Sequence, residues 1–383
     1  MKKRVEIFYA TYGGGHLSAA NAIKQYIDEN YSDKYETHIL DIVEYCSKVV
    51  NKISKSAYNR MATDATWAWE KVYYKSQKGT LAKISNTSNK IMAVKMSRYF
   101  KEHRPDIVIS THPFGSQITS YLKAKKKTNC KSYTILTDFV SHNQWLVGSE
   151  NVDKFFVSNQ LMKDDIVKEA NIPEEKIEVT GIPISKNFLE PHDNKKTLKE
   201  LDFSPKKKTI LFFGGGAFGL GKDNVDQILY SLTDLEDTQI IAISGKNEDR
   251  FNTFKKIVKN SGKEKNIRVI QFANNVPELM SISNLVITKP GGLTISESLV
   301  SGLPIMIIYP LPGQEEANAD FLEKSGSAIW LRNIEDSKTI LNLLITNDDK
   351  LLKMHKASLK IAKPNSTKTI CKETLGQIKN TKK

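Results

Sequence analysis

The chain has 383 residues, enough for two or three domains with a sizeable core. It contains no apolar run of about 18 residues, which predicts no membrane-spanning helix, and its three scattered cysteines exclude a cysteine-based metal site. The net charge is +14, and all of this excess lies between Lys48 and Lys131, where 18 basic residues accompany 4 acidic ones. Such a segment attracts polyanions, either nucleic acid or anionic lipid, unless it is only a solvated face.

The chain opens with a strand-like run over residues 5–10, a glycine turn, and a helical pattern over residues 17–27. His16 follows the glycines directly, in the first turn of the predicted helix. There the helix dipole lowers the pKa of an imidazole and favours the neutral form that can act as a base. The alternative is a surface or capping histidine after a structural turn.

Residues 44–100 combine many lysines with aromatic side chains such as Trp67, Trp69 and Tyr73 in an irregular helical pattern. Basic helices with interfacial aromatic residues are typical of a surface that lies on a membrane without crossing it. The same apolar residues can instead belong to the core of the domain. Both interpretations stay open for this segment.

Two further predicted strands, over residues 105–110 and 132–137, each end in a group of polar or aromatic residues. The residues that follow these strands include His112, Asp138, His142 and Trp145. Open parallel sheets bind their ligands at the carboxyl ends of the strands. We therefore expect these side chains to lie near one another and near His16.

A second sheet begins with the strand-like run over residues 209–213. The glycines that follow it, at positions 214–219, match the G-x-G-x-x-G pattern of dinucleotide-binding turns. That use requires an acidic residue at the end of the next strand, but residues 239–243 are followed by Ser-Gly-Lys-Asn. The pattern therefore disfavours NAD and leaves a diphosphate-binding or domain-cleft loop.

The stretch around residues 285–300 gives the strongest signal of a nucleotide site. A strand-like run over residues 285–287 is followed by Pro290, Gly291 and Gly292 and then by a helical pattern up to Val300. Such a turn directs unpaired amides and a helix dipole at one point, and this arrangement binds phosphate. Glu297 stands one helical turn further on, where a carboxylate can accept hydrogen bonds from a ribose diol.

The order of elements predicts an α/β fold with two doubly wound, Rossmann-like domains that face each other across a cleft. The predicted divisions are an N-terminal acceptor and membrane-docking domain over residues 1–185, a linker over residues 186–208, a C-terminal nucleotide-sugar domain over residues 209–350, and a basic C-terminal helix over residues 351–383.

Six motifs stand in a fixed order along the chain. They are Tyr-Gly-Gly-Gly-His at 12–16, Thr-Asp-Phe at 137–139 with His142 and Trp145, Val-Asp-Lys-Phe-Phe-Val at 152–157, Gly-Lys-Asn at 245–247, Lys-Pro-Gly-Gly-Leu-Thr at 289–294 and Pro-Gly-Gln-Glu at 312–315. In order and spacing they resemble the family of monogalactosyldiacylglycerol synthases and bacterial processive diacylglycerol β-glucosyltransferases, over nearly the whole chain. The Lys-Pro-Gly-Gly variant looks more like the bacterial glucosyltransferases than the plant galactosyltransferases.

The resemblance implies a GT-B fold and inverting transfer of a hexose, favoured as glucose, from a UDP-sugar to diacylglycerol and on to its glycolipid product. It implies His16 as the base or its close partner, Asp138 as the group that orients or shares the proton, and His112, His142 and Trp145 on the acceptor side. The nucleotide-sugar residues implied are Gly14, Gly15, Gly216, Phe272, Gly291, Gly292, Leu293, Thr294, Glu297, Gln314, Glu315 and Asn318. The implied location is peripheral, on the cytoplasmic face of the cell membrane, with an anionic lipid surface as partner.

A single-displacement inversion needs one positioned base and stabilisation of the departing diphosphate. The chain contains no Asp-x-Asp pair, the usual metal-binding motif, so we predict no essential metal and no cofactor. Three alternatives remain: a UDP-sugar 2-epimerase, the N-acetylglucosaminyltransferase that makes the lipid-linked peptidoglycan precursor, and a non-catalytic UDP-sugar sensor. Nucleic acid is not expected as a partner, because no recognised binding module accompanies the charge.

Overall fold

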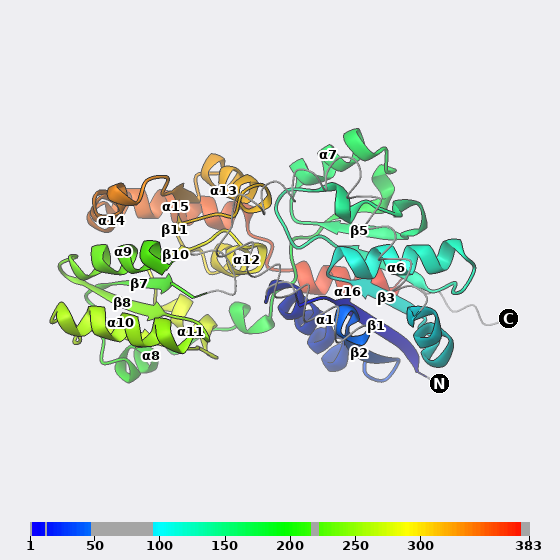
Figure 1. Ribbon diagram of the computed structural model, residues 1–383, viewed down its shortest axis with the longest axis horizontal. Coiled ribbons are helices and arrows are strands. Elements are labelled where there is room, and N and C mark those ends of the chain that lie inside the picture. Colours follow the sequence, from blue (N-terminus) through cyan, green and yellow to red (C-terminus); the bar gives the residue numbers. More distant parts are fainter. Residues whose placement is uncertain (1, 12–13, 47–94, 216–221, 377–383) are drawn as a thin grey trace. The chain divides into compact units, whose positions relative to one another are not determined.

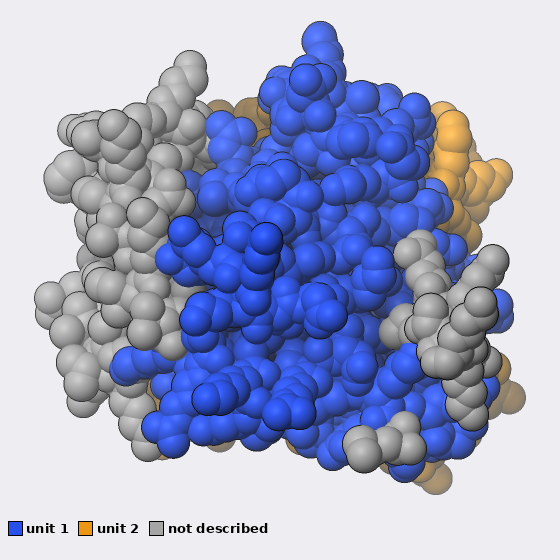
Figure 2. All heavy atoms as spheres, turned by 90° about the vertical axis from the view of Figure 1, so that its right-hand side faces the viewer, with its two compact units in different colours: residues 1–60, 67–186, 363–383 blue, residues 61–66, 187–362 orange. Residues whose placement is uncertain are grey.

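The computed structural model describes residues 2–11, 14–46, 95–215 and 222–376 (Figure 1). Within these residues the chain forms two compact units, which are coloured separately in Figure 2. Unit 1 contains the described residues up to 186 and those from 363 onward, and unit 2 contains the described residues from 187 to 362. Most of the predicted membrane-docking segment, as well as Gly216, lies outside the described residues.

Unit 1 is built on a six-stranded parallel sheet in the order β2-β1-β3-β4-β5-β6. The strands are β1 (Lys3–Tyr9), β2 (Tyr35–Asp41), β3 (Ile107–Ser110), β4 (Lys131–Ile135), β5 (Lys154–Val157) and β6 (Ile177–Val179). The helices are α1 (Gly15–Tyr31), α2 (Ile42–Cys46), a helix over residues 95–103, α6 (Pro113–Ala124), α7 (Gln160–Ala170) and α16 (Ser366–Gly376). The strand order reverses between β1 and β3, and such a switch point is where open α/β sheets bind ligands.

Helices cover both faces of this sheet, because alternate residues of its strands point to opposite sides. On one face, Ile7 of β1 packs in a cluster with Ile23 of α1 and Ile370 of α16. On the other face, Phe8 of β1 packs with Met96 and with Ile118 of α6. Two buried layers therefore fix the direction in which β1 delivers the chain to the turn before α1.

Unit 2 is built on a second six-stranded parallel sheet, in the order β12-β11-β10-β7-β8-β9 (Figure 1). The strands are β7 (Lys208–Phe213), β8 (Thr238–Ile243), β9 (Ile267–Ile270), β10 (Leu285–Thr288), β11 (Ile305–Ile307) and β12 (Ala328–Trp330). The helices are α8 (Asn194–Glu200), α9 (Lys222–Thr233), α10 (Glu248–Asn260), α11 (Val276–Ser281), α12 (Gly292–Val300), α13 (Gln314–Lys324), α14 (Ser337–Thr346) and α15 (Asp348–Ile361). Here the switch point lies between β7 and β10, the two strands that precede the glycine-rich turns.

The prediction of two doubly wound α/β domains is confirmed. Strands β1, β3, β4, β7, β8 and β10 lie at the apolar runs that predicted them. Two local differences have clear causes. The predicted linker contains α8, because the Asp193 side chain accepts a hydrogen bond from the amide of Lys196 and starts a helix there. The short strand β12 at the edge of the sheet has only three residues and left no readable pattern.

The C-terminal segment over residues 351–383 is divided between the two units. Helix α15 lies in unit 2, whereas α16 packs on α1 in unit 1. The hydroxyl of Thr367 accepts a hydrogen bond from the amide of Ile184 at 3.1 Å and donates one to its carbonyl oxygen at 2.8 Å. Gly181 has φ +86°, and an added Cβ would lie 2.3 Å from the Cβ of Lys363, so the returning chain requires glycine there.

Candidate active site

His16 is the second residue of α1 and stands beyond the carboxyl end of β1, at the switch point of unit 1. Its Nδ1 lies 2.6 Å from the carbonyl oxygen of Thr111, which follows β3, and 3.1 Å from the hydroxyl of Thr137, which follows β4. A carbonyl oxygen can only accept, so Nδ1 carries the proton and donates it to Thr111. In the neutral ring Nε2 is then left unprotonated, as a general base requires.

Two rings lie beside His16, and a third lies beside one of these. The ring of His112 meets it edge-on with centroids 4.7 Å apart, and the ring of the buried Trp145 lies 6.4 Å away. His142 in turn lies 6.0 Å from Trp145. Nδ1 of His112 accepts the amide N–H of Phe114 at 3.2 Å, which caps α6 and leaves the ring proton of neutral His112 on Nε2. The structure thus brings together His16, the predicted base, and all three predicted acceptor-side residues.

All three histidines are held neutral. Burial lowers the pKa of His16 to about 4, and the hydrogen bond to Thr111 only partly opposes this effect. Burial and the neighbouring His16 lower the pKa of His142 to about 4. Burial and the two neighbouring histidines hold the pKa of His112 well below its ordinary value. The lowered pKa of His16 was expected from the helix dipole, but its main cause is burial.

Asp138 follows Thr137 beyond β4 and is buried. Gly14 is exposed at the N-cap position of α1, and Gly15 is the first residue of that helix. These two glycines belong to unit 1, whereas the other described residues of the predicted nucleotide-sugar site belong to unit 2. Their roles stay predictions.

In unit 2 the turn between β10 and α12 has the geometry of an anion site. The first hydrogen bond of the helix runs from the amide of Ile295 to the carbonyl of Gly291 at 3.1 Å. The amides of Gly292, Leu293 and Thr294 precede it and have no carbonyl within the helix to bond. A Cβ added to Gly291 would have no heavy atom within 4 Å, so a ligand has open space beside the turn.

Glu297 lies further along α12 and is half-buried. Burial raises the pKa of its carboxyl group to about 8, so the group is mostly protonated at neutral pH. Within the described part of the chain, no hydrogen bond or ion pair reaches this carboxyl group. It is suited to a ligand that brings its own donors, such as the two hydroxyls of a ribose.

The first turn of α13 packs against the β10–α12 turn. Glu315 forms an ion pair with Lys289 at 2.8 Å, and the fully buried Asn318 donates to the carbonyl of Pro290 at 3.0 Å. Gln314, the first residue of α13, is half-buried. The side chains of Glu315 and Asn318 therefore bond to other residues of the protein. Both residues lie next to the predicted nucleotide-sugar site.

Two further loops lie at the same edge of the unit 2 sheet. A Cβ added to Gly215, after β7, would lie 2.3 Å from the backbone nitrogen of Gly245, after β8, so the two loops touch and require glycine. Phe272, after β9, is 55% exposed, and the ammonium of Lys246 lies 5.2 Å from its ring centroid. Phe272 is one of the nucleotide-sugar residues that the family resemblance implies, and its ring and backbone are open to a ligand here.

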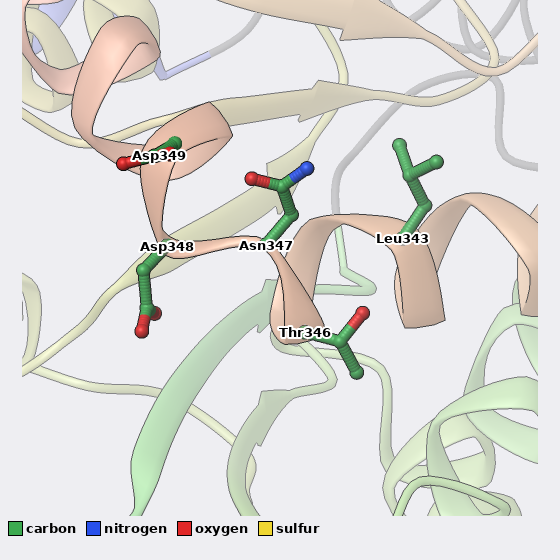
Figure 3. Close-up of a pocket in the computed structure, with 5 residues that line it drawn as sticks. All are labelled: Leu343, Thr346, Asn347, Asp348 and Asp349. Atoms are coloured by element: carbon green, nitrogen blue, oxygen red, sulfur yellow. The ribbon is translucent and has the colours of Figure 1, made fainter.

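A hollow of about 450 Å³ lies elsewhere, where α14 meets α15 (Figure 3). It is lined by Leu343, Thr346, Asn347, Asp348 and Asp349. Asp348 pairs with Lys208, the first residue of β7, so this hollow lies at the amino ends of the strands, opposite the glycine turns. In the described ranges no group of three or more His, Cys, Asp or Glu residues could hold a metal, and no helix there is long and apolar enough to cross a bilayer.

Three residues that shape these sites were not predicted to be site residues, although two of them belong to the motifs named above. Thr111 and Thr137 fix the orientation of His16, and Lys289 fixes Glu315. Each threonine comes one residue before a predicted site residue at a strand end, and this position could have indicated that the threonine belongs to the site. Lys289 likewise immediately precedes the Pro-Gly-Gly turn.

Two family models match most of the chain. Residues 16–184 match the monogalactosyldiacylglycerol (MGDG) synthase model, and residues 209–373 match the glycosyltransferase family 28 C-terminal domain. Processive diacylglycerol β-glucosyltransferases from Bacillus licheniformis and Bacillus subtilis are 28% and 27% identical to the chain. These alignments cover 98% and 97% of this chain and 95% of each relative.

Solved structures with the same fold include MurG from Acinetobacter baumannii, with a TM-score of 0.65 and 17% identity over 98% of this chain and 99% of that one. They also include a UDP-GlcNAc 2-epimerase from Neisseria meningitidis bound to UDP-GlcNAc. Its TM-score is 0.61, at 15% identity over 98% of this chain and all of that chain.

Proposed function

We propose that this protein, which belongs to the family of monogalactosyldiacylglycerol synthases and processive diacylglycerol β-glucosyltransferases, transfers glucose from UDP-glucose to the hydroxyl group of diacylglycerol. The glycolipid product can serve as the next acceptor. The observation that carries this proposal is the state of His16: a neutral imidazole, with its proton fixed on Nδ1 by Thr111, beside aromatic side chains at the switch point of unit 1.

The transfer proceeds with inversion in a single displacement. Nε2 of His16 takes the proton of the acceptor hydroxyl as its oxygen attacks the anomeric carbon of the sugar. The bond between that carbon and the β-phosphate oxygen breaks, and the electron pair leaves with UDP. Asp138 assists by orienting or sharing that proton, and His142, His112 and Trp145 form the acceptor side.

The departing UDP is stabilised by the turn before α12. The amides of Gly292, Leu293 and Thr294 point to the diphosphate, and the helix dipole adds the equivalent of about half a positive charge. Glu297 holds the ribose diol, the backbone at Phe272 holds the uracil, and Gln314 faces the hexose.

The protein acts as a peripheral protein at the cytoplasmic face of the membrane, because diacylglycerol keeps its chains in the bilayer while its hydroxyl reacts. Support comes from the excess of basic residues between Lys48 and Lys131. Each basic residue near an anionic surface contributes about 1 kcal/mol of attraction.

The test is transfer of radiolabel from UDP-glucose, and separately from UDP-galactose, into chloroform-extractable lipid. Diacylglycerol is supplied in neutral and in anionic vesicles, and the His16→Ala variant is assayed alongside. We expect labelled lipid from UDP-glucose, dependence on His16, and a higher rate on anionic vesicles that declines with salt. Equal rates on both vesicles would remove the electrostatic part of the proposal.

The solved epimerase with the same fold suggests one alternative function, and a sensor of UDP-sugar is another. If neither donor labels lipid while UDP still binds, the acceptor assignment is wrong. An epimerase would then release UDP and a sugar with altered configuration at C2, whereas a sensor would bind UDP-sugar without turnover.

A further inference from the structure

Helix α13 is fastened to two consecutive residues of the turn between β10 and α12. The ammonium Nζ of Lys289 lies 2.8 Å from Oε1 of Glu315, and the side-chain amide of Asn318 donates to the carbonyl of Pro290 at 3.0 Å. Glu315 and Asn318 are three residues apart, so they project from the same face of α13. The two contacts therefore hold that face against the turn whose amides are unpaired.

The ion pair is enclosed by the protein. The side chains of Lys289 and Glu315 are only 21% and 13% exposed, so water and salt screen their attraction less than they screen a surface pair. The other carboxylate oxygen of Glu315 accepts the amide N–H of Leu311 at 2.9 Å. Both oxygens are thus engaged by protein donors, which favours a positioning role for Glu315 over the sugar-binding role that the family resemblance implies.

The start of α13 is fixed by two neighbouring features, the conformation of Gly313 and the ion pair between Lys289 and Glu315. Gly313 has φ +92°, a conformation that favours glycine, and its amide donates to the side chain of Glu316 at 2.9 Å. The chain therefore reverses at one defined point, and Gln314 follows directly. Because Glu315 is the next residue, its bond to Lys289 fixes where Gln314 stands relative to the turn.

We propose that Lys289 is a positioning residue of the donor site, whose ion pair with Glu315 holds the first turn of α13, and with it Gln314, in register with the diphosphate-binding turn. This inference rests on the proposed function, because it takes a nucleoside diphosphate hexose as the ligand. The diphosphate contacts the amides of α12, and the hexose lies on the α13 side. Loss of the pair therefore weakens recognition of the hexose more than recognition of UDP.

The experiment measures the affinities of UDP and UDP-glucose by titration calorimetry, with no acceptor present. In Lys289→Met we expect the ratio of UDP-glucose to UDP affinity to fall roughly tenfold, the effect of one charge-assisted hydrogen bond, while UDP affinity changes little. Lys289→Arg keeps the charge and restores most of this ratio. The double variant Lys289→Met/Glu315→Gln shows no further fall, because both changes remove the same interaction.

The matched control is Arg332→Met. It breaks a more exposed ion pair, 2.7 Å long, between Arg332 and Glu323 at the other end of α13. We expect it to leave both affinities unchanged. Melting temperatures establish that each variant is folded. If Lys289→Met fails to fold because it leaves Glu315 unpaired, the double variant, which removes both charges, is judged by the same affinity ratio.

Equal weakening of UDP and UDP-glucose in Lys289→Met would show that Lys289 acts on the diphosphate itself, and the inference would be wrong. A wild-type protein that binds neither nucleotide would also overturn it. A wild-type protein that binds both but labels no lipid overturns the proposed acceptor and leaves the inference standing.

Discussion

Helices α1 and α12 occupy equivalent places in the two units, but their first turns expose opposite chemistry. Each helix begins at a glycine and follows a strand at the switch point of a parallel sheet. In unit 1 the turn delivers His16 into a group of neutral rings, with its tautomer fixed by Thr111. In unit 2 the turn presents open amides, and the nearest acid on its helix is Glu297, which has no side-chain partner among the described residues.

In the proposed reaction, this difference gives each unit one part. Neutral imidazoles and a buried tryptophan suit an uncharged hydroxyl that must lose a proton. Amides at a helix N-terminus suit a group that leaves with negative charge. The shared arrangement of strand, glycine and helix therefore indicates that a small ligand binds there. The side chains that follow the glycine indicate the chemistry of that ligand. Variants of each site test the two roles, removal of the acceptor proton and stabilisation of the departing UDP, separately.

The largest effect is expected at His16. We expect His16→Gln to lower the rate of transfer by about 10²–10⁴, the usual contribution of a general base, with UDP affinity unchanged. The control is His38→Gln, which removes a histidine on β2 that pairs with Glu36. Transfer rates and calorimetric UDP titrations of both variants decide the matter. A His16→Gln variant that transfers at the wild-type rate would move the base to another residue.

The dependence of the transfer rate on pH also tests the assignment of His16 as the base. Because burial lowers the pKa of His16 to about 4, the base stays unprotonated as the pH falls through 6.5 and becomes protonated only near pH 4. Activity dependent on His16 is therefore present at pH 5.5 and lost toward pH 4. An acid limb at pH 6.5 would show that the imidazole is exposed to water in the working enzyme.

The second effect, expected at Glu297, is smaller. With a pKa of about 8 the free carboxyl group is protonated at pH 7, and two donating ribose hydroxyls favour its ionised form. UDP binding at pH 7 therefore releases about one proton, measured by calorimetry in buffers of different ionisation enthalpy. In Glu297→Gln we expect roughly tenfold weaker UDP binding and no proton release. Unchanged release in this variant would assign the proton to another group.

Much of this arrangement could be predicted from the sequence. The strands are short β-branched runs, and the carboxyl ends of parallel strands share one edge, so His112 and Trp145 were expected near His16 before their distances were known. The glycine turn before α12 was equally readable, because its function resides in the backbone.

The features that could not be predicted from the sequence all depend on contacts between residues far apart in the chain. Thr111 reaches His16 through a backbone carbonyl 95 residues away, which no side-chain pattern reveals. Burial controls the pKa of His16 and Glu297, and burial depends on the whole fold. The return of α16 to unit 1 was also hidden. The sequence predicted only a basic C-terminal helix over residues 351–383, whereas Ile370 and Cys371 of α16 are fully buried.

The smallest effect is expected from metal removal, and it tests whether the unit 2 turn is sufficient on its own. We expect transfer to be unchanged in EDTA, with no gain from added Mg²⁺ or Mn²⁺. The amides of Gly292, Leu293 and Thr294 and the dipole of α12 act on the same diphosphate oxygens that a metal would hold. The assay is radiolabel transfer with chelator, followed by metal addition. Activity lost in EDTA and restored by either ion would mean that the turn needs a cation, and that residues outside the described ranges, or the substrate itself, bring its ligands.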